Sequence, residues 1–327
     1  FNHFGGSLLA SGEAAGLDLY SRLLYRRMDG WRMKNYAQQL QAFIKVGRRG
    51  VRSDTWIPYT LSSDSIEGPQ ALPESWLEGG ALPMDVISPP TDRRELQYTG
   101  GNGDYFRPRL HFFSGHLERA LNSVLQVSLS GFTRLVDFTQ FSDNLTEADV
   151  LGLTGIASGG GTLQVAYEPD PDVMIAGGVD VTKNDVDIEI LELPNRDFPN
   201  IERGTTELAG TAENNLGFYT DLFWRADTRT ALQGSLRFDH VDVPFEDFLD
   251  PEYSGDNRFS QLTGALGVSR ETLVGTRLFV GYARGFRAPV ILEITCADPE
   301  DPCPLPFELG ADPPLEPVTT DSWQAGF

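Results

Sequence analysis

The six residues LQVSLS, from Leu125 to Ser130, place three aliphatic side chains in strict alternation with three polar ones. A period of two indicates a β-strand, because successive side chains of a strand point to opposite faces. The stretch therefore predicts a strand with one apolar and one polar face. The apolar face carries Leu125, Val127 and Leu129, and the polar face carries Gln126, Ser128 and Ser130. The fold has to place these two faces in unlike surroundings.

The same alternation recurs along most of the chain. It is clearest in residues 39–46, 216–225, 232–239, 261–269 and 278–287. Apolar stripes at helical spacing are hard to find, and the nearest exception, residues 144–153, is expected to form a loop. The sequence therefore predicts an all-β fold of antiparallel strands.

The composition of the chain argues against several classes of protein. The chain has 327 residues with 26 basic and 47 acidic side chains, a formal net charge of -21. That balance disfavours a nucleic-acid partner, because the phosphate backbone has to be neutralised by lysine and arginine. No apolar run reaches the roughly 20 residues of a membrane helix. The first residues also lack the basic and apolar regions of a signal peptide.

Two architectures fit this alternation: a soluble sandwich with its apolar faces inside, and a membrane barrel with its apolar face towards lipid. Strand length favours the barrel, since membrane strands run for about 9–11 residues against about 5–6 in globular sheets. Long alternating segments occupy residues 17–31, 36–48, 123–138 and 272–287.

The order of the connections favours the barrel as well. Short connections are predicted at 11–16, 47–53, 118–123, 167–173, 225–230 and 269–275, and they alternate with long ones at 26–36, 63–105, 142–161, 191–214, 242–258 and after Phe286. Outer-membrane barrels have short periplasmic turns and long extracellular loops. About thirteen strands are expected. Because closed bacterial barrels have even strand numbers, we expect residues 1–327 to be part of a larger barrel.

One late motif resembles a known family. Tyr282-Ala283-Arg284 leads into Gly285-Phe286-Arg287-Ala288-Pro289, and Thr319 to Phe327 forms the next strand-like segment, with Trp323 and Gly326 in an aromatic-x-x-Gly pattern. This resembles the late-barrel pattern of TonB-dependent outer-membrane receptors. The resemblance implies an antiparallel transmembrane β-barrel of about 22 strands with a plug in its lumen.

The resemblance also implies a function and partners. Such receptors sit in the outer membrane of Gram-negative bacteria and import scarce nutrients, here expected to be a ferric siderophore, with energy from the TonB complex. Nothing in residues 1–327 looks like the plug domain or the TonB box, so the chain is interpreted as barrel only. The expected partners are outer-membrane lipid, the plug, TonB and the small-molecule ligand. The alternatives are a passive porin or adhesin-like barrel and a secreted β-rich binding protein.

No motif indicates an enzyme, a metal or a cofactor. Ser158-Gly159-Gly160-Gly161 lacks the Gly-Lys-Ser/Thr of a phosphate loop, and the four histidines lack zinc spacing. The acidic residues of 242–258 could collect calcium or simply form a solvated surface. Five polar strand residues are predicted to face the lumen: Arg107, Arg109, His111, Arg237 and Asp239. They could contact the plug or an anionic ligand, or only line a polar wall.

Cys296 and Cys303 are the only cysteines, and both follow the Phe286 strand in a long loop. If that loop is extracellular, both thiols pass through the oxidising periplasm, so a disulfide between them is predicted. The alternative is a pair of free or metal-binding thiols.

Overall fold

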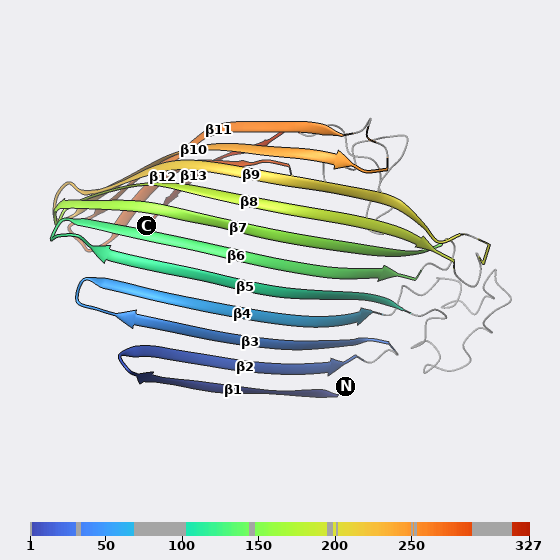
Figure 1. Cartoon of the computed structure of the whole chain (residues 1–327). Helices are drawn as coiled ribbons and strands as arrows, with labels where there is room; N and C mark the ends of the chain where they lie inside the picture. The colour runs from blue at the N-terminus through green and yellow to red at the C-terminus, as the bar shows by residue number, and fades with distance from the viewer. Residues whose placement is uncertain are drawn as a thin grey trace.

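Thirteen β-strands follow one another in the part of the chain that the structure describes, and they form one sheet (Figure 1). The computed structural model describes residues 2–30, 34–68, 103–143, 148–194, 199–200, 202–249, 251, 254–289 and 316–327. The strands are β1 (His3–Ala14), β2 (Leu17–Asp29), β3 (Tyr36–Arg49), β4 (Ser53–Gly68), β5 (Asp104–Ala120), β6 (Leu125–Ser142), β7 (Asp149–Asp170), β8 (Val173–Leu193), β9 (Gly204–Arg225), β10 (Thr230–Asp247), β11 (Gly255–Glu271), β12 (Arg277–Arg287) and β13 (Val318–Gly326).

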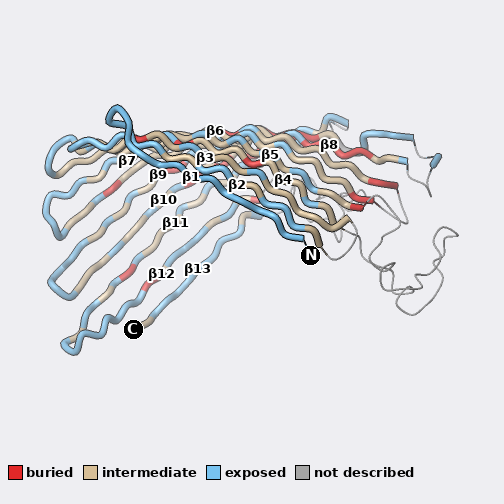
Figure 2. Tube along the Cα trace, turned by 90° about the horizontal axis from the view of Figure 1, so that it is seen from below, coloured by how far each residue is buried: buried red, intermediate tan, exposed pale blue. Residues whose placement is uncertain are grey.

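The sheet order is the chain order, and every neighbouring pair is antiparallel. The predicted antiparallel all-β class is therefore confirmed, and the described residues contain thirteen strands, in agreement with the expected number of about thirteen. The sheet curves into a trough. The trough is open, because β1 and β13 have one neighbouring strand each and do not pair with each other. Figure 2 shows both edge strands exposed along almost their whole length. No described residue forms part of an α-helix.

All short connections lie at one end of the trough, here called the turn end, and the opposite end is called the loop end (Figure 1). Ala15 and Gly16 both have positive φ, 53° and 73°, as the tightest hairpin turn requires. At another turn, Asp227 accepts backbone hydrogen bonds from Arg229 (2.7 Å) and Thr230 (2.9 Å). Such local bonds fix the turn without help from distant residues.

At the loop end, the predicted long connections are partly wrong. β7 begins at Asp149 and β9 at Gly204, while β10 continues to Asp247. Much of 142–161, 191–214 and 242–258 is therefore strand. Glycine, alanine and threonine interrupt the apolar–polar alternation in 149–161 and 204–214. The extensions consequently lack the signal on which the prediction depended.

A cluster of buried apolar residues lies on or beside these extensions. Ile188 and Ile190 of β8, Ala209 of β9 and Phe245 of β10 are between 1% and 8% exposed and pack together. The pairing register places all four on the same face of the sheet as Asp180 and Arg237. The core of the described chain thus sits at the loop end.

Candidate functional site

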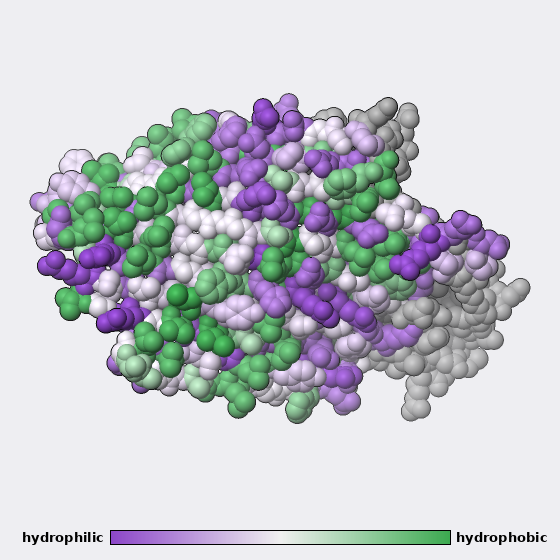
Figure 3. Space-filling view, in the orientation of Figure 1, coloured by the Kyte–Doolittle hydropathy of each residue, from purple (hydrophilic) through white to green (hydrophobic). Residues whose placement is uncertain are grey.

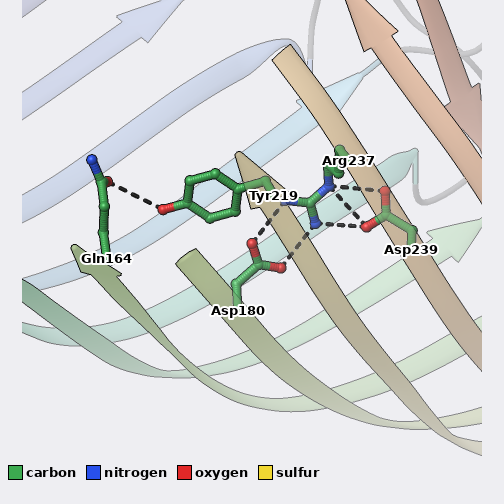
Figure 4. A network of polar contacts seen from close by, with 5 residues as sticks. All are labelled: Gln164, Asp180, Tyr219, Arg237 and Asp239. Atoms are coloured by element: carbon green, nitrogen blue, oxygen red, sulfur yellow. Dashed lines mark hydrogen bonds and ion pairs between the residues drawn. The ribbon is translucent and has the colours of Figure 1, made fainter. Parts of the chain in front are cut away.

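Two unlike faces organise the sheet. Asp180, Arg237 and Asp239 lie on the face around which the sheet curves, here called the inner face (Figure 4). The opposite, outer face carries large exposed apolar side chains near the turn end: Leu129, Leu163, Val181, Leu216, Phe218, Leu236, Phe238 and Leu262. Figure 3 shows hydrophobic side chains gathered towards the turn end and hydrophilic ones in a zone nearer the loop end. An exposed apolar face this extensive is expected in contact with lipid or a partner.

An ion-pair cluster joins two strands, β8 and β10, on the inner face (Figure 4). Arg237 of β10 donates two parallel bonds to Asp180 of β8, with Nη1–Oδ1 at 2.8 Å and Nη2–Oδ2 at 2.9 Å. The same guanidinium bonds Asp239, two residues along β10, at 2.6 Å and 2.8 Å. Bidentate geometry of this kind is the strongest that arginine forms with carboxylates. We call these three residues the Arg237 clasp, since it links β8 to β10 across β9.

Glycines make room for these side chains. The two aspartates of the clasp both lie opposite Gly217 of β9 in the register. A β-carbon there would overlap the guanidinium of Arg237 and come within 2.5 Å of the Asp180 carboxylate. Gly178 of β8 has the same role for Tyr219, whose hydroxyl donates to Gln164 at 3.1 Å. Long polar side chains thus lie flat along the inner wall.

The five residues predicted to share the lumen face do not share one face. Residues directly opposite each other in an antiparallel pair point to the same side. From Arg237 the pairs run through Tyr219, Gly178, Gln164 and Ser128 to Glu118 of β5. Even-numbered residues of β5 are therefore inner. Arg237 and Asp239 lie on the inner face, whereas Arg107, Arg109 and His111 lie on the outer face.

This prediction is therefore corrected for Arg107, Arg109 and His111. The reason is that these residues lie nearer the loop end of β5 than the apolar residues of its outer face. The outer face of β5 is apolar at Leu117 and Phe113 and becomes polar from His111 onward. Beyond the apolar band both faces can be polar, so polarity alone does not identify the lumen side.

The outer polar residues of β5 have their own contacts. Arg107 pairs with Glu67 of β4 at 3.1 Å and lies 4.0 Å from the ring centroid of Tyr105. His111 shares a hydrogen bond of 2.8 Å with the hydroxyl of Tyr59. These contacts hold β4 and β5 together at the edge of the apolar band.

The family motif lies at the loop end of β12. Gly285, Phe286 and Arg287 close that strand, and Ala288 and Pro289 follow it. The two halves of the resemblance pair with each other, because β12 is hydrogen-bonded to β13. Their outer side chains are also joined: Tyr282 donates to Asp321 at 2.6 Å, and Arg284 lies 3.6 Å from the same carboxylate. Cys296 and Cys303 lie outside the described residues.

Sequence reasoning missed Asp180, Gly217 and Tyr219. Asp180 lies between Val179 and Val181, so alternation could have assigned it to the polar face. Its partnership with Arg237 depends on the register of three strands, which is not a local property of the sequence.

Two kinds of feature are absent from the described residues. No helix among them has the length and apolar character needed to cross a membrane. They also contain no group of three or more His, Cys, Asp or Glu residues arranged to hold a metal ion.

Residues 46–327 match the family described as TonB dependent receptor-like, beta-barrel. No curated protein matches the chain. The fold is similar to the ferric yersiniabactin uptake receptor FyuA from Yersinia pestis, with a TM-score of 0.68 and 13% identity over 88% of this chain and 45% of that one. It is also similar to the siderophore receptor PiuA from Acinetobacter baumannii, with a TM-score of 0.72 and 11% identity over 99% and 52%. A third similar structure is the copper transporter OprC, with a TM-score of 0.67 and 13% identity over 89% and 44%. The chain thus spans about half the length of these proteins, and identities this low indicate a common fold alone.

Proposed function

Because this chain belongs to the TonB-dependent receptor-like β-barrel family, we propose that it forms part of the wall of an outer-membrane receptor of a Gram-negative bacterium. The receptor imports a scarce nutrient, a ferric siderophore, with energy supplied by the TonB complex. The observation that carries this proposal is an exposed apolar band on the outer face, near the turn end, together with the polar Arg237 clasp on the inner face of the same sheet. A wall of this kind separates lipid from an aqueous lumen.

The orientation in the membrane follows from the connections. The turn end faces the periplasm and the loop end faces the outside of the cell, as in other barrels with short and long connections. The polar inner face, including the Arg237 clasp, lines the lumen, where it contacts a plug domain. The family match supports this arrangement.

The ligand class is supported by similar structures whose names specify ferric yersiniabactin and a siderophore. The similar copper transporter makes copper the competing cargo. Uptake by cells that produce the complete receptor tests both. Radioactive iron should enter as a ferric siderophore from a panel of catecholates, hydroxamates and citrate, and deletion of the receptor gene should abolish that uptake.

The same assay tests the energy source. Uptake should stop in a strain without TonB and on dissipation of the proton gradient. Uptake that persists without TonB would instead support the passive porin. Copper uptake without iron uptake would replace the siderophore as the proposed cargo.

We also propose a disulfide between Cys296 and Cys303, in the segment that connects β12 and β13. An extracellular loop is exposed to oxidising conditions before and after assembly. Mass spectrometry of unreduced, alkylated receptor from outer membranes should recover the bridged peptide. Recovery of both cysteines as alkylated thiols would contradict the disulfide and the placement of the loop.

A further inference from the structure

A second group of polar and aromatic side chains lies on the inner face, close to the turn end of β2, β3, β4 and β5 (Figure 1). The register continues from Glu118 of β5, which is inner, through Asp54 of β4 to Arg49 of β3. Gly47 of β3 then pairs with Asp18 of β2. Even-numbered residues of β2 and β4 and odd-numbered residues of β3 are therefore inner.

Two cations and two aromatic rings form a square on the inner face of β2 and β3. Tyr20 lies opposite Lys45, and Arg22 lies opposite Phe43. The two rings form one diagonal and are in contact, with their centroids 5.7 Å apart and their planes at 68°. Arg22 and Lys45 form the other diagonal, so two positive charges flank a small aromatic surface. We call these four residues the β2–β3 square.

Lys45 is held in place by a stack that continues across the sheet. Its Nζ lies 5.0 Å from the ring centroid of Trp56 on β4. That ring is stacked on His116 of β5, with the centroids 4.9 Å apart, and His116 Nδ1 shares a hydrogen bond of 2.8 Å with the hydroxyl of Ser130 on β6. An aromatic face attracts an ammonium group without neutralising its charge. The charge of Lys45 is therefore fixed in position and still available to an anion.

Neither cation of the square is neutralised by the described chain. No carboxylate among the described residues forms an ion pair with Arg22 or Lys45. Asp18 lies on the same face of β2, yet it joins neither of them. Arg49 differs, because its guanidinium lies 3.6 Å from the carboxylate of Asp54. In a chain with a formal net charge of -21, two unpaired cations beside an aromatic surface favour a ligand that is both anionic and aromatic.

We propose that the β2–β3 square binds a ferric catecholate as it passes along the lumen towards the periplasm. This rests on the proposed import of a ferric siderophore and narrows its class. A ferric tris-catecholate is an anion built of aromatic rings. Its charge suits Arg22 and Lys45, and its rings suit the aromatic surface of Tyr20 and Phe43. A ferric trihydroxamate without aromatic rings is uncharged and matches neither feature.

The position of the square determines when it contacts the ligand. It lies near the turn end, which the proposed orientation places at the periplasm, whereas the ligand is captured at the loop end. The contact is therefore made after capture. Loss of such a contact lowers the rate of import and leaves the affinity of capture unchanged.

The test is uptake of radioactive iron by cells that produce the complete receptor, supplied as a ferric tris-catecholate or as a ferric trihydroxamate. Arg22→Gln and Lys45→Gln should each lower the maximal rate of catecholate uptake about tenfold, the order expected for loss of one charge-assisted contact. Catecholate binding to cells without TonB should stay unchanged in both variants. Lys45→Arg, which keeps the charge, should retain the wild-type rate.

Arg49→Gln is the matched control, because Arg49 lies on the same strand and face as Lys45 but already has a carboxylate partner. It should import at the wild-type rate. Equal losses in Arg49→Gln and Lys45→Gln, or no loss in either variant of the square, would overturn the proposal. If the glutamine variants do not assemble, Phe43→Leu decides alone, because it removes a ring and keeps an apolar side chain; an unchanged rate of catecholate uptake then overturns the proposal.

The wild-type receptor separates this site from the proposed function. Import of the trihydroxamate without the catecholate overturns the site and leaves the proposed function standing. Import of no ferric siderophore refutes the proposed function, and the site with it.

Discussion

Removing the cation of the Arg237 clasp is the sharpest test of the inner wall. Arg237→Met keeps much of the side-chain volume but leaves Asp180 and Asp239 facing each other across Gly217. Breaking a fully buried pair by removing one partner costs about 3–5 kcal/mol, against about 0–1 kcal/mol for an exposed pair. The Arg237 side chain is 34% exposed and its partners 21% and 11%, so the site lies between these limits. We expect the substitution to lower the free energy of unfolding by about 2 kcal/mol.

The measurement is guanidinium unfolding of the complete receptor in lipid vesicles, followed by circular dichroism in both directions. Tyr219→Phe is the control, because it removes one neutral hydrogen bond to Gln164 from the same wall and should cost about 0.5–1.5 kcal/mol. Replacing both aspartates by asparagine in the Arg237→Met background should restore most of the stability. The reasoning is refuted if Arg237→Met costs no more than Tyr219→Phe, or if the triple variant recovers nothing.

Three further predictions concern single positions. Gly217→Ala should destabilise the receptor, because the added carbon displaces the clasp, whereas Gly115→Ala should be nearly neutral, since nothing lies within 4 Å of its added carbon; unfolding midpoints compare the two. Val127→Arg should cost more than Ser128→Arg, because the cost of a charge on the lipid face rises towards about 2–4 kcal/mol as its position approaches the bilayer midplane, and equal losses would contradict the assignment of the faces. Hydrogen bonds from the Arg229 backbone and the Thr230 side chain lower the pKa of Asp227 below its ordinary 3.8. The ionised carboxylate of Asp227 should therefore contribute its full stabilisation above pH 3.8, and this contribution should be lost as the pH falls through the lower pKa of the folded state. The stability difference between wild type and Asp227→Asn, followed from pH 7 into acid, should shrink only in that acid range.

The alternation of apolar and polar residues predicted the strands, because this pattern is visible within each strand alone. Leu125 to Ser130 identifies a two-faced strand without knowledge of its neighbours. The same rule failed for Arg107, Arg109 and His111, because polarity reports contact with water, and both faces of the sheet can be polar beyond the apolar band. It also failed for the strand extensions around Asp149 and Gly204, where glycine, alanine and threonine interrupt the alternation.

The polar contacts between strands, such as the one between Arg237 and Asp180, could not be predicted from the sequence for a different reason. Arg237 was predicted to face the lumen, but its partner Asp180 lies 57 residues away along the chain. Which residues meet depends on the register of β8, β9 and β10 together. That register is fixed by turn lengths and side-chain packing over the whole sheet.

The central claim is that this sheet spans the outer membrane with its turns inside and its loops outside. Single cysteines at Ser254, near the loop end of β11, and at Asp227, in the turn between β9 and β10, test it most directly in a receptor whose Cys296 and Cys303 are replaced by serine. On intact cells an impermeant maleimide should label the cysteine at position 254 and spare the one at position 227 until the outer membrane is permeabilised. Labelling of position 227 alone would show that the topology is inverted, and equal labelling of both on intact cells would show that the sheet does not span the membrane.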